Sequence, residues 1–262
     1  MTVSDSSENE PVVVARDGRI AWVTLNRPDR RNAISRAMRQ SLQEVFHTLE
    51  DDDGIHVVVL TGAGSAFCAG VDLQEASGGD AHGHALTAKP VAYALERFTK
   101  PVIAAINGPA VGGGLELALA ADLRVASTDA RFALPEVKIG SLPGSGGTQR
   151  LSRAVAPAIA NKMVFTGEPI DAHEALRCGL ISDLVAPDEL IPVAEKLARQ
   201  IGDNAPLSLR AAKIALRAAQ SDSLASGLAL ERALWGALSV SRDREEGRAA
   251  FRERRPPRFI GE

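Results

Sequence analysis

Three short apolar runs separated by helical patterns constrain the fold of this chain more than any other feature. Residues 20–25 (IAWVTL), 57–61 (VVVLT) and 102–106 (VIAAI) have the length and the β-branched content of buried strands. Between the first two, Ser35 fits a helix N-cap and apolar residues then recur on one helical face; a second helical pattern covers residues 91–98. This alternation predicts an α/β fold with parallel strands, in which the loops that follow the strands are available for a site.

The C-terminal part of the chain has a different pattern. From about residue 187 strand-like runs disappear, and helical segments are expected at residues 189–201, 207–219, 224–240 and 242–254. Their apolar side chains, among them Leu228, Leu234, Trp235 and Leu238, must be covered by the α/β body or by another subunit. The Gly/His-rich residues 77–84 are expected to form a mobile surface loop, and the polar N-terminus a loose tail.

Charge and composition narrow the class of partner. The 262 residues carry a formal net charge of −3, which gives no broad attraction to nucleic acid or to an anionic membrane. Cys68 and Cys178 are too few and too far apart for a disulfide framework, and the five histidines show no metal-ligand spacing. No secretory signal or uninterrupted apolar span is found, so we expect a cytoplasmic protein.

The first candidate for chemistry is the loop that follows the strand at residues 102–106. Gly112, Gly113 and Gly114 precede a run of Leu and Ala that contains a single acid, Glu116. The first amides of such a helix lack intrahelical acceptors, so they suit an anion or an oxygen that is becoming one. The structural alternative is close packing of the glycines, with Glu116 complementing the dipole of its own helix.

A second glycine-rich loop follows the strand at residues 57–61. Two loops at the ends of two strands of one sheet are able to give two N–H groups to a single oxygen. The Gly62-Ala63-Gly64 sequence resembles part of a dinucleotide-binding motif, but Phe67 stands where that motif needs its third glycine. Cys68, between Phe67 and Ala69, is interpreted as a small core residue rather than a nucleophile.

The third candidate segment is FALPEVKIGSLPGSGGTQR, at residues 132–150. Its glycines and prolines predict a shaped loop rather than a helix. Glu136 is either an ordinary acid of a turn or a partner of Glu116. Two carboxylates in one dry pocket would have coupled pKa values, so that one holds a proton while the other accepts one.

Together these segments resemble the crotonase superfamily, also called the enoyl-CoA hydratase/isomerase family, along nearly the whole chain. The resemblance rests on residues 25–35 (LNRPDRRNAIS), 64–73 (GSAFCAGVDL), 100–127, 132–151 and 245–259 in this order. It implies a tail at residues 1–10, an α/β core of spiralling ββα repeats at 11–200, and a helical oligomerisation region at 201–262. It also implies homotrimers or homohexamers.

The resemblance further implies that an acyl-CoA thioester is the substrate and its carbonyl oxygen is held by the backbone N–H groups of Val71 and Gly113. Glu116 and Glu136 then hold a water molecule that adds across the double bond of a trans-2-enoyl-CoA, as in fatty acid β-oxidation. Glu136 is assigned as the proton donor to C2 and Glu116 as the group that activates the water, with the reverse division left open. Apart from CoA within the substrate, no cofactor or metal is implied.

The residues implied to contact CoA or substrate are Arg30, Ala33, Ala69, Val71, Asp72, Leu73, Gln74, Gly113 and, from a neighbouring subunit, Phe251 and Arg254. Gln74 stands where many hydratases have Lys, and Arg30 or Arg31 is expected to compensate. Residues 77–89 would edge the acyl pocket. Two alternatives stay open: enoyl-CoA isomerisation on the same scaffold, and a non-catalytic acyl-CoA-binding or RNA-binding homologue.

Overall fold

The computed structural model describes residues 10–76 and 89–262, so the expected loop at 77–84 and the tail, apart from Glu10, lie outside it. Its main sheet has the strand order β1-β2-β3-β4-β6-β9, and a small sheet has the order β5-β7-β8. The strands are β1 Val12–Asp17, β2 Ile20–Leu25, β3 Val57–Gly62, β4 Val102–Ile106, β5 Ala110–Val111, β6 Leu123–Ser127, β7 Arg131–Ala133, β8 Ile170–Asp171 and β9 Asp183–Val185.

The helices occupy the connections and the C-terminal quarter of the chain. They are η1 Pro28–Arg30, α1 Arg36–Asp51, α2 Leu73–Ala76, α4 Tyr93–Arg97, α5 Gly113–Ala120, η2 Glu136–Ile139, α6 Gly147–Ala154, α7 Pro157–Thr166, α8 Ala172–Arg177, η3 Pro187–Glu189, α9 Leu190–Gly202, α10 Pro206–Ala218, α11 Leu224–Leu238 and α12 Arg242–Glu253. None of the described helices is both long enough and apolar enough to cross a bilayer.

The main sheet is parallel except at one edge, where β1 pairs antiparallel with β2. Alternate residues of its strands enter two separate cores, as the two-residue period of a strand requires. Val57 and Val59 pack toward α9, whereas Val58 and Leu60 pack toward α1, α4 and α5. Coverage of both faces explains why the central strands are continuous apolar runs.

The predicted α/β class is confirmed, and so are the three predicted strands, with β3 one residue longer than expected. Ser35 is the N-cap of α1, since its hydroxyl accepts a hydrogen bond from the Met38 amide at 3.1 Å. The helix expected at residues 91–98 is shorter, and the four C-terminal helices lie within two residues of their predicted bounds. The predicted boundary between residues 200 and 201 falls in the last turn of α9.

The expectation of a loop throughout residues 132–150 is wrong. A short 3₁₀ helix, η2, begins at Glu136, and α6 begins at Gly147. Gly146 is the N-cap of α6 with φ +95°, a conformation that glycine adopts without strain. The glycines therefore shape the entry to a helix instead of excluding one.

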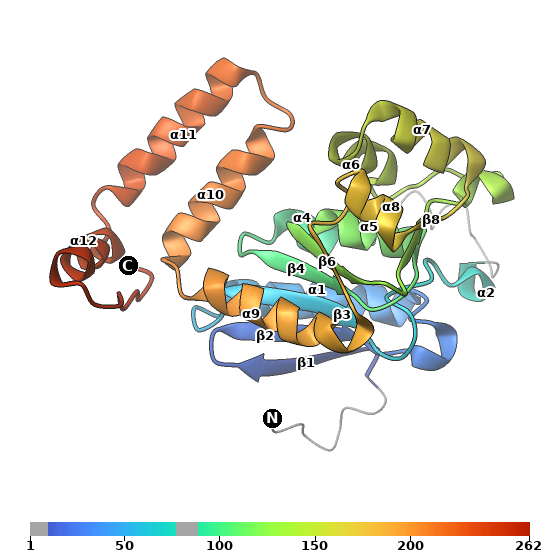
Figure 1. The fold of residues 1–262 in the computed structure, drawn as a ribbon, viewed down its shortest axis with the longest axis horizontal. Helices are drawn as coiled ribbons and strands as arrows, with labels where there is room; N and C mark the ends of the chain where they lie inside the picture. The colour runs from blue at the N-terminus through green and yellow to red at the C-terminus, as the bar shows by residue number, and fades with distance from the viewer. Residues whose placement is uncertain (1–9, 77–88) are drawn as a thin grey trace.

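The helices α10, α11 and α12 stand to one side of the α/β body (Figure 1). No residue of α11 is buried, and Leu228 and Trp235 are 54% and 58% exposed. The body of the same chain therefore does not cover the apolar side chains of this region.

Asn32 joins the loop around η1 to the loop after β3. This side chain is fully buried, donates to the carbonyls of Ala63 and Ala66 at 2.9 and 2.8 Å, and accepts from the Arg27 amide at 2.8 Å. Asn32→Asp places a carboxylate oxygen against those two carbonyls. We expect unfolding free energy to fall by about 3 kcal/mol or more in urea denaturation. Asn26→Asp, at a partly exposed amide, is the control, and equal losses in both variants would contradict this prediction.

Candidate active site

The three glycines before Glu116 serve different purposes. Gly112 precedes α5 with φ +54°, and a Cβ built on it would lie 3.0 Å from Oε1 of Glu136. A Cβ on Gly114 would collide with the Cys68 carbonyl, so the close-packing interpretation is confirmed at that position. Gly113, between them, is the first residue of α5. The loop therefore combines close packing with an open helix N-terminus.

The two glycine-rich loops lie against each other, as the sequence predicted. Cys68 forms a parallel bridge with Ala110, through a bond from its amide to the Pro109 carbonyl and one from the Val111 amide to its own carbonyl. A Cβ built on Gly113 would lie 3.7 Å from the Val71 nitrogen. The amides of Val71 and Gly113 are thus neighbours in space.

Among the described residues, neither of these amides donates a hydrogen bond. On either side of Val71, the Ile34 amide donates to the Gly70 carbonyl and the Asp72 amide donates to the Ile34 carbonyl. Gly113 stands in the first turn of α5, ahead of the intrahelical bonds. Two adjacent free N–H donors can stabilise negative charge on one oxygen.

Glu116 is buried, with 3% of its surface exposed, yet its carboxylate is well bonded. Oε1 accepts hydrogen bonds from the Ser145 and Gly147 amides at 2.6 and 2.9 Å, where α6 begins. Within the described residues no hydrogen bond reaches Oε2. The structural alternative for this acid holds in part, because Glu116 stands in the first turn of α5 while its carboxylate also bonds to the N-terminus of α6.

The environment of Glu116 alters its protonation. Burial raises the pKa of this carboxyl above the usual range of a glutamate. The hydrogen bonds from Gly147 and Ser145 and the charge of Arg150 act in the opposite direction. A raised pKa makes the ionised carboxylate a stronger base than an ordinary glutamate.

Glu136 is the first residue of η2 and is half-buried. Its Oε2 is buried and has no hydrogen-bond partner among the described residues. Burial raises the pKa of Glu136, a bond to its own backbone lowers it, and the charge of Glu116 raises it again. The structure thus brings the two predicted acids into one coupled site, in which the pKa of each carboxyl is raised.

Most of the residues predicted to contact CoA line one groove of about 350 Å³. They are Arg30, Ala33, Ala69, Val71, Asp72, Leu73 and Gln74. The Arg30 guanidinium donates to the Gln74 side chain at 3.0 Å, so a cation does reach the position of the missing lysine. The Asp72 carboxylate, in contrast, binds Arg27 and the Gln74 amide, which gives it a role within the protein.

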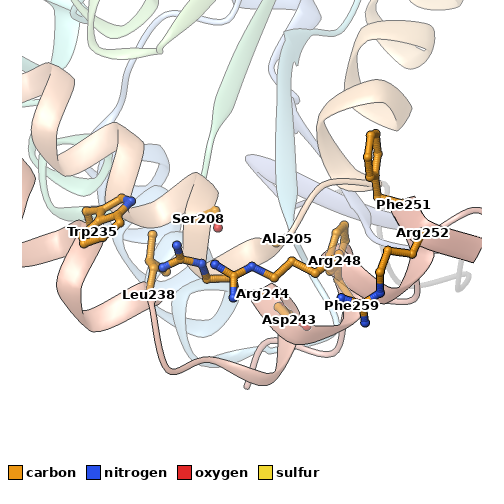
Figure 2. A pocket seen from close by; sticks show the side chains of 11 residues that line it. Ala205, Ser208, Trp235, Leu238, Asp243, Arg244, Arg248, Phe251, Arg252 and Phe259 are labelled. Carbon is orange, nitrogen blue, oxygen red and sulfur yellow. The ribbon is translucent and has the colours of Figure 1, made fainter.

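Phe251 and Arg254 do not lie in this groove. They belong to the end of α12, which is at the opposite end of the molecule from α2 (Figure 1). Phe251 is 86% exposed and borders a hollow with Trp235 and Arg248 (Figure 2). Within one chain these two residues are far from the acids, and a contribution from a neighbouring subunit stays a prediction.

The sequence interpretation missed the residues that hold Glu116. Ser145 and Gly147 supply the two amides, and Arg150 binds the Ser145 carbonyl at 2.9 Å. The glycines before residues 147–150 were a usable signal for a helix N-terminus. Cys68 was correctly interpreted: it is fully buried, its thiol donates to the Asn32 carbonyl, and burial raises its pKa to about 12.

Comparison with known proteins agrees with this geometry. A sequence model described as enoyl-CoA hydratase/isomerase matches residues 15–262. The (E)-benzylidenesuccinyl-CoA hydratase of Thauera aromatica is 45% identical, covering 96% of this chain and 99% of the relative. The 2,3-dehydroadipyl-CoA hydratase of Escherichia coli strain K12 is 43% identical, covering 95% and 98%.

Solved structures give the same result. The crystal structure of an enoyl-CoA hydratase from Bacillus anthracis superposes with a TM-score of 0.93 at 36% identity, covering 96% of this chain and 100% of that one. A fold and a site of this kind define an enzyme of acyl-CoA chemistry. The chain belongs to the enoyl-CoA hydratase/isomerase family, the crotonase superfamily.

Proposed function

We propose that the protein is an enoyl-CoA hydratase that adds water across the 2,3 double bond of a trans-2-enoyl-CoA to give a 3-hydroxyacyl-CoA. One observation carries this assignment: two coupled carboxylates, Glu116 and Glu136, share a site with the adjacent free amides of Val71 and Gly113. Water addition needs a base, an acid and a place for enolate charge. This arrangement has all three.

In the proposed reaction the two amides hold the thioester oxygen. Glu116 takes a proton from water while the water oxygen bonds to C3, and the π electrons move to give an enolate whose charge those amides stabilise. Glu136 then donates its proton to C2 as the C=O bond is restored. Glu116 is left protonated and Glu136 ionised, and a proton transferred between them restores the starting state.

The assay is hydration of crotonyl-CoA, followed as loss of the absorbance of the conjugated thioester. Isomerisation of a 3-enoyl-CoA without hydration would favour the family's other reaction, which needs only an acid at the position of Glu136. The Glu116→Gln variant distinguishes the two reactions further, because it should abolish hydration and leave isomerisation intact. Binding of CoA esters with neither reaction would favour the non-catalytic alternative.

Substrate range is the next property to measure. The two relatives above are named for substrates that carry a free carboxylate besides the thioester, and one of these substrates is also aromatic. We propose a panel of short, long, aromatic and carboxylate-bearing enoyl-CoA esters, because relative kcat/KM values across it define the acyl pocket.

The pH dependence of kcat/KM should be bell-shaped. Glu116 must be ionised, so the rate falls as pH decreases through a pKa that burial raises above the ordinary value of a glutamate. Glu136 must be protonated, so the rate also falls as pH increases through its raised pKa. The two limbs belong to the coupled pair. Initial rates from about pH 4 to 10 test this, and a rate with no alkaline decline would contradict the role of Glu136.

We also propose that the chain works as a homotrimer or homohexamer. The exposed apolar residues of α10 and α11, including Leu216, Leu224 and Trp235, need a partner surface. Such an assembly would allow Phe251 and Arg254 of one subunit to reach the CoA groove of the next. Sedimentation velocity measures the mass, and a monomer at micromolar concentration would contradict the proposal.

The remaining assignments are proposals of the same kind. We expect hydration to need no metal or redox cofactor, since the acids and amides account for the chemistry, and we expect no nucleic-acid or membrane partner. Cys68 and Cys178 are free thiols, in keeping with work in the cytoplasm.

A further inference from the structure

The turn that holds Glu116 is itself held by Arg150. The Nη1 atom of Arg150 donates to the Ser145 carbonyl at 2.9 Å. Gly146 lies between Ser145 and Gly147 in the sequence, and a Cβ built on it would collide with the same Nη1 atom. The guanidinium therefore lies directly against the backbone whose amides bind Oε1 of Glu116.

The other side of Arg150 is fixed to a separate element. Its Nη2 forms an ion pair with Oε1 of Glu96, on α4, at 2.7 Å, and these two side chains are only 25% and 35% exposed. Just before α4, the Val91 amide donates to the Ser145 hydroxyl at 3.0 Å. The turn at Ser145 is thus tied at two points to the segment around α4.

Arg150 also acts on Glu116 through its charge. Burial raises the pKa of Glu116, and the positive charge of Arg150 opposes that rise. In the part of the chain that the structure describes, the other charged groups around this cluster are Glu136 of η2, Glu96 of α4, and Arg217 of α10 with its partner Asp122. Among the described residues, Arg150 is the one charged side chain that alters the pKa of Glu116.

We propose that Arg150 is a positioning residue for hydration: it fixes the turn at residues 145–147 so that two amides hold Oε1 of Glu116 and leave Oε2 for water. The inference rests on the proposed hydratase function. Arg150 touches no reacting atom, so its effect reaches the reaction through Glu116. A turn that shifts displaces the catalytic base and its water, and small displacements in an active site are costly to the rate.

The test measures crotonyl-CoA hydration by Arg150→Gln and Arg150→Lys across pH. For Arg150→Gln we expect kcat to fall roughly 10- to 100-fold, with a much smaller change in KM. The acidic limb of kcat/KM should move to higher pH, because a charge that favours ionised Glu116 is lost. Lysine keeps the positive charge but lacks the several N–H donors of the guanidinium. Arg150→Lys should therefore show the wild-type acidic limb of kcat/KM while recovering only part of the lost kcat.

Arg153→Gln is the matched control, since Arg153 lies on the same helix and bonds to the carbonyls of Gln149 and Gln220 instead. It should leave kcat and the acidic limb unchanged. Glu96→Ala removes the oxygen that binds Arg150, whereas a glutamine would still offer a carbonyl to the guanidinium. The charge of Arg150 stays, so we expect a loss of kcat without an upward shift of the acidic limb. If Arg150→Gln does not fold, this variant at Glu96 still tests whether Arg150 positions the turn at residues 145–147.

Two results would overturn the inference in a wild-type enzyme that hydrates crotonyl-CoA. One is an Arg150→Gln variant with the wild-type acidic limb and kcat within about twofold of wild type. The other is Glu96→Ala with unchanged kcat. A wild-type protein without hydratase activity would instead contradict the proposed function itself.

Discussion

Glu136→Gln is expected to lower kcat for crotonyl-CoA hydration by about 10²- to 10⁴-fold, the usual contribution of a general acid. Glutamine keeps the shape of the side chain but has no proton to give to C2. The carboxyl suits this role because burial and the charge of Glu116 both raise its pKa, and because Oε2 makes no hydrogen bond among the described residues. Steady-state kinetics should place the loss in kcat, with KM changed by less than about threefold.

Glu168→Gln is the matched control for that experiment. Glu168 forms an ion pair with Lys138 of η2, the short helix that also contains Glu136. Glu168→Gln therefore removes a carboxylate that contacts this helix without touching Glu136. Its side chain is 67% exposed, and we expect kcat to stay at the wild-type value. A Glu136→Gln enzyme with nearly wild-type kcat would remove this residue from the mechanism.

The central part of the fold could be predicted because burial leaves a simple pattern. β2, β3 and β4 are covered on both faces and therefore read as continuous apolar runs. The edge strand β1 was missed, since only Val12 is buried and the strand ends in Arg16 and Asp17. β9 has three residues, too few for any periodicity.

The site was predictable only in part. Glycine-rich loops after two strands indicated backbone donors, and the resemblance assigned them to Val71 and Gly113. The bonding partners of Glu116 were not predictable, because the Ser145 and Gly147 amides are 29 and 31 residues away along the chain. Contacts of this kind depend on how α5 meets α6, and local patterns do not encode that angle. The same holds for Asp72, whose ion pair with Arg27 spans 45 residues.

Gly113→Pro is expected to lower kcat for hydration by about 10²- to 10³-fold, the cost of losing one donor to an oxyanion. Proline has no backbone N–H, and its ring carbon would occupy the position of the missing hydrogen. The substitution suits this position because the first residue of a helix tolerates proline. Gly112, before it, has ψ −124°, outside the helical region that a following proline disfavours. The helix should therefore form while the donor is absent.

Gly113→Ala separates the donor from the added carbon atoms. Its Cβ would lie 3.4 Å from Cδ1 of Ile34 and 3.5 Å from Cγ2 of Val71, which are ordinary van der Waals contacts, and the amide stays in place. We expect the alanine enzyme to keep most of its activity and both variants to keep the wild-type circular dichroism spectrum. If alanine and proline reduce kcat equally, crowding is the cause and the Gly113 amide does not hold the thioester oxygen. A loss confined to proline, whose ring carbon takes the place of the N–H hydrogen, means that the thioester oxygen binds at the Gly113 amide.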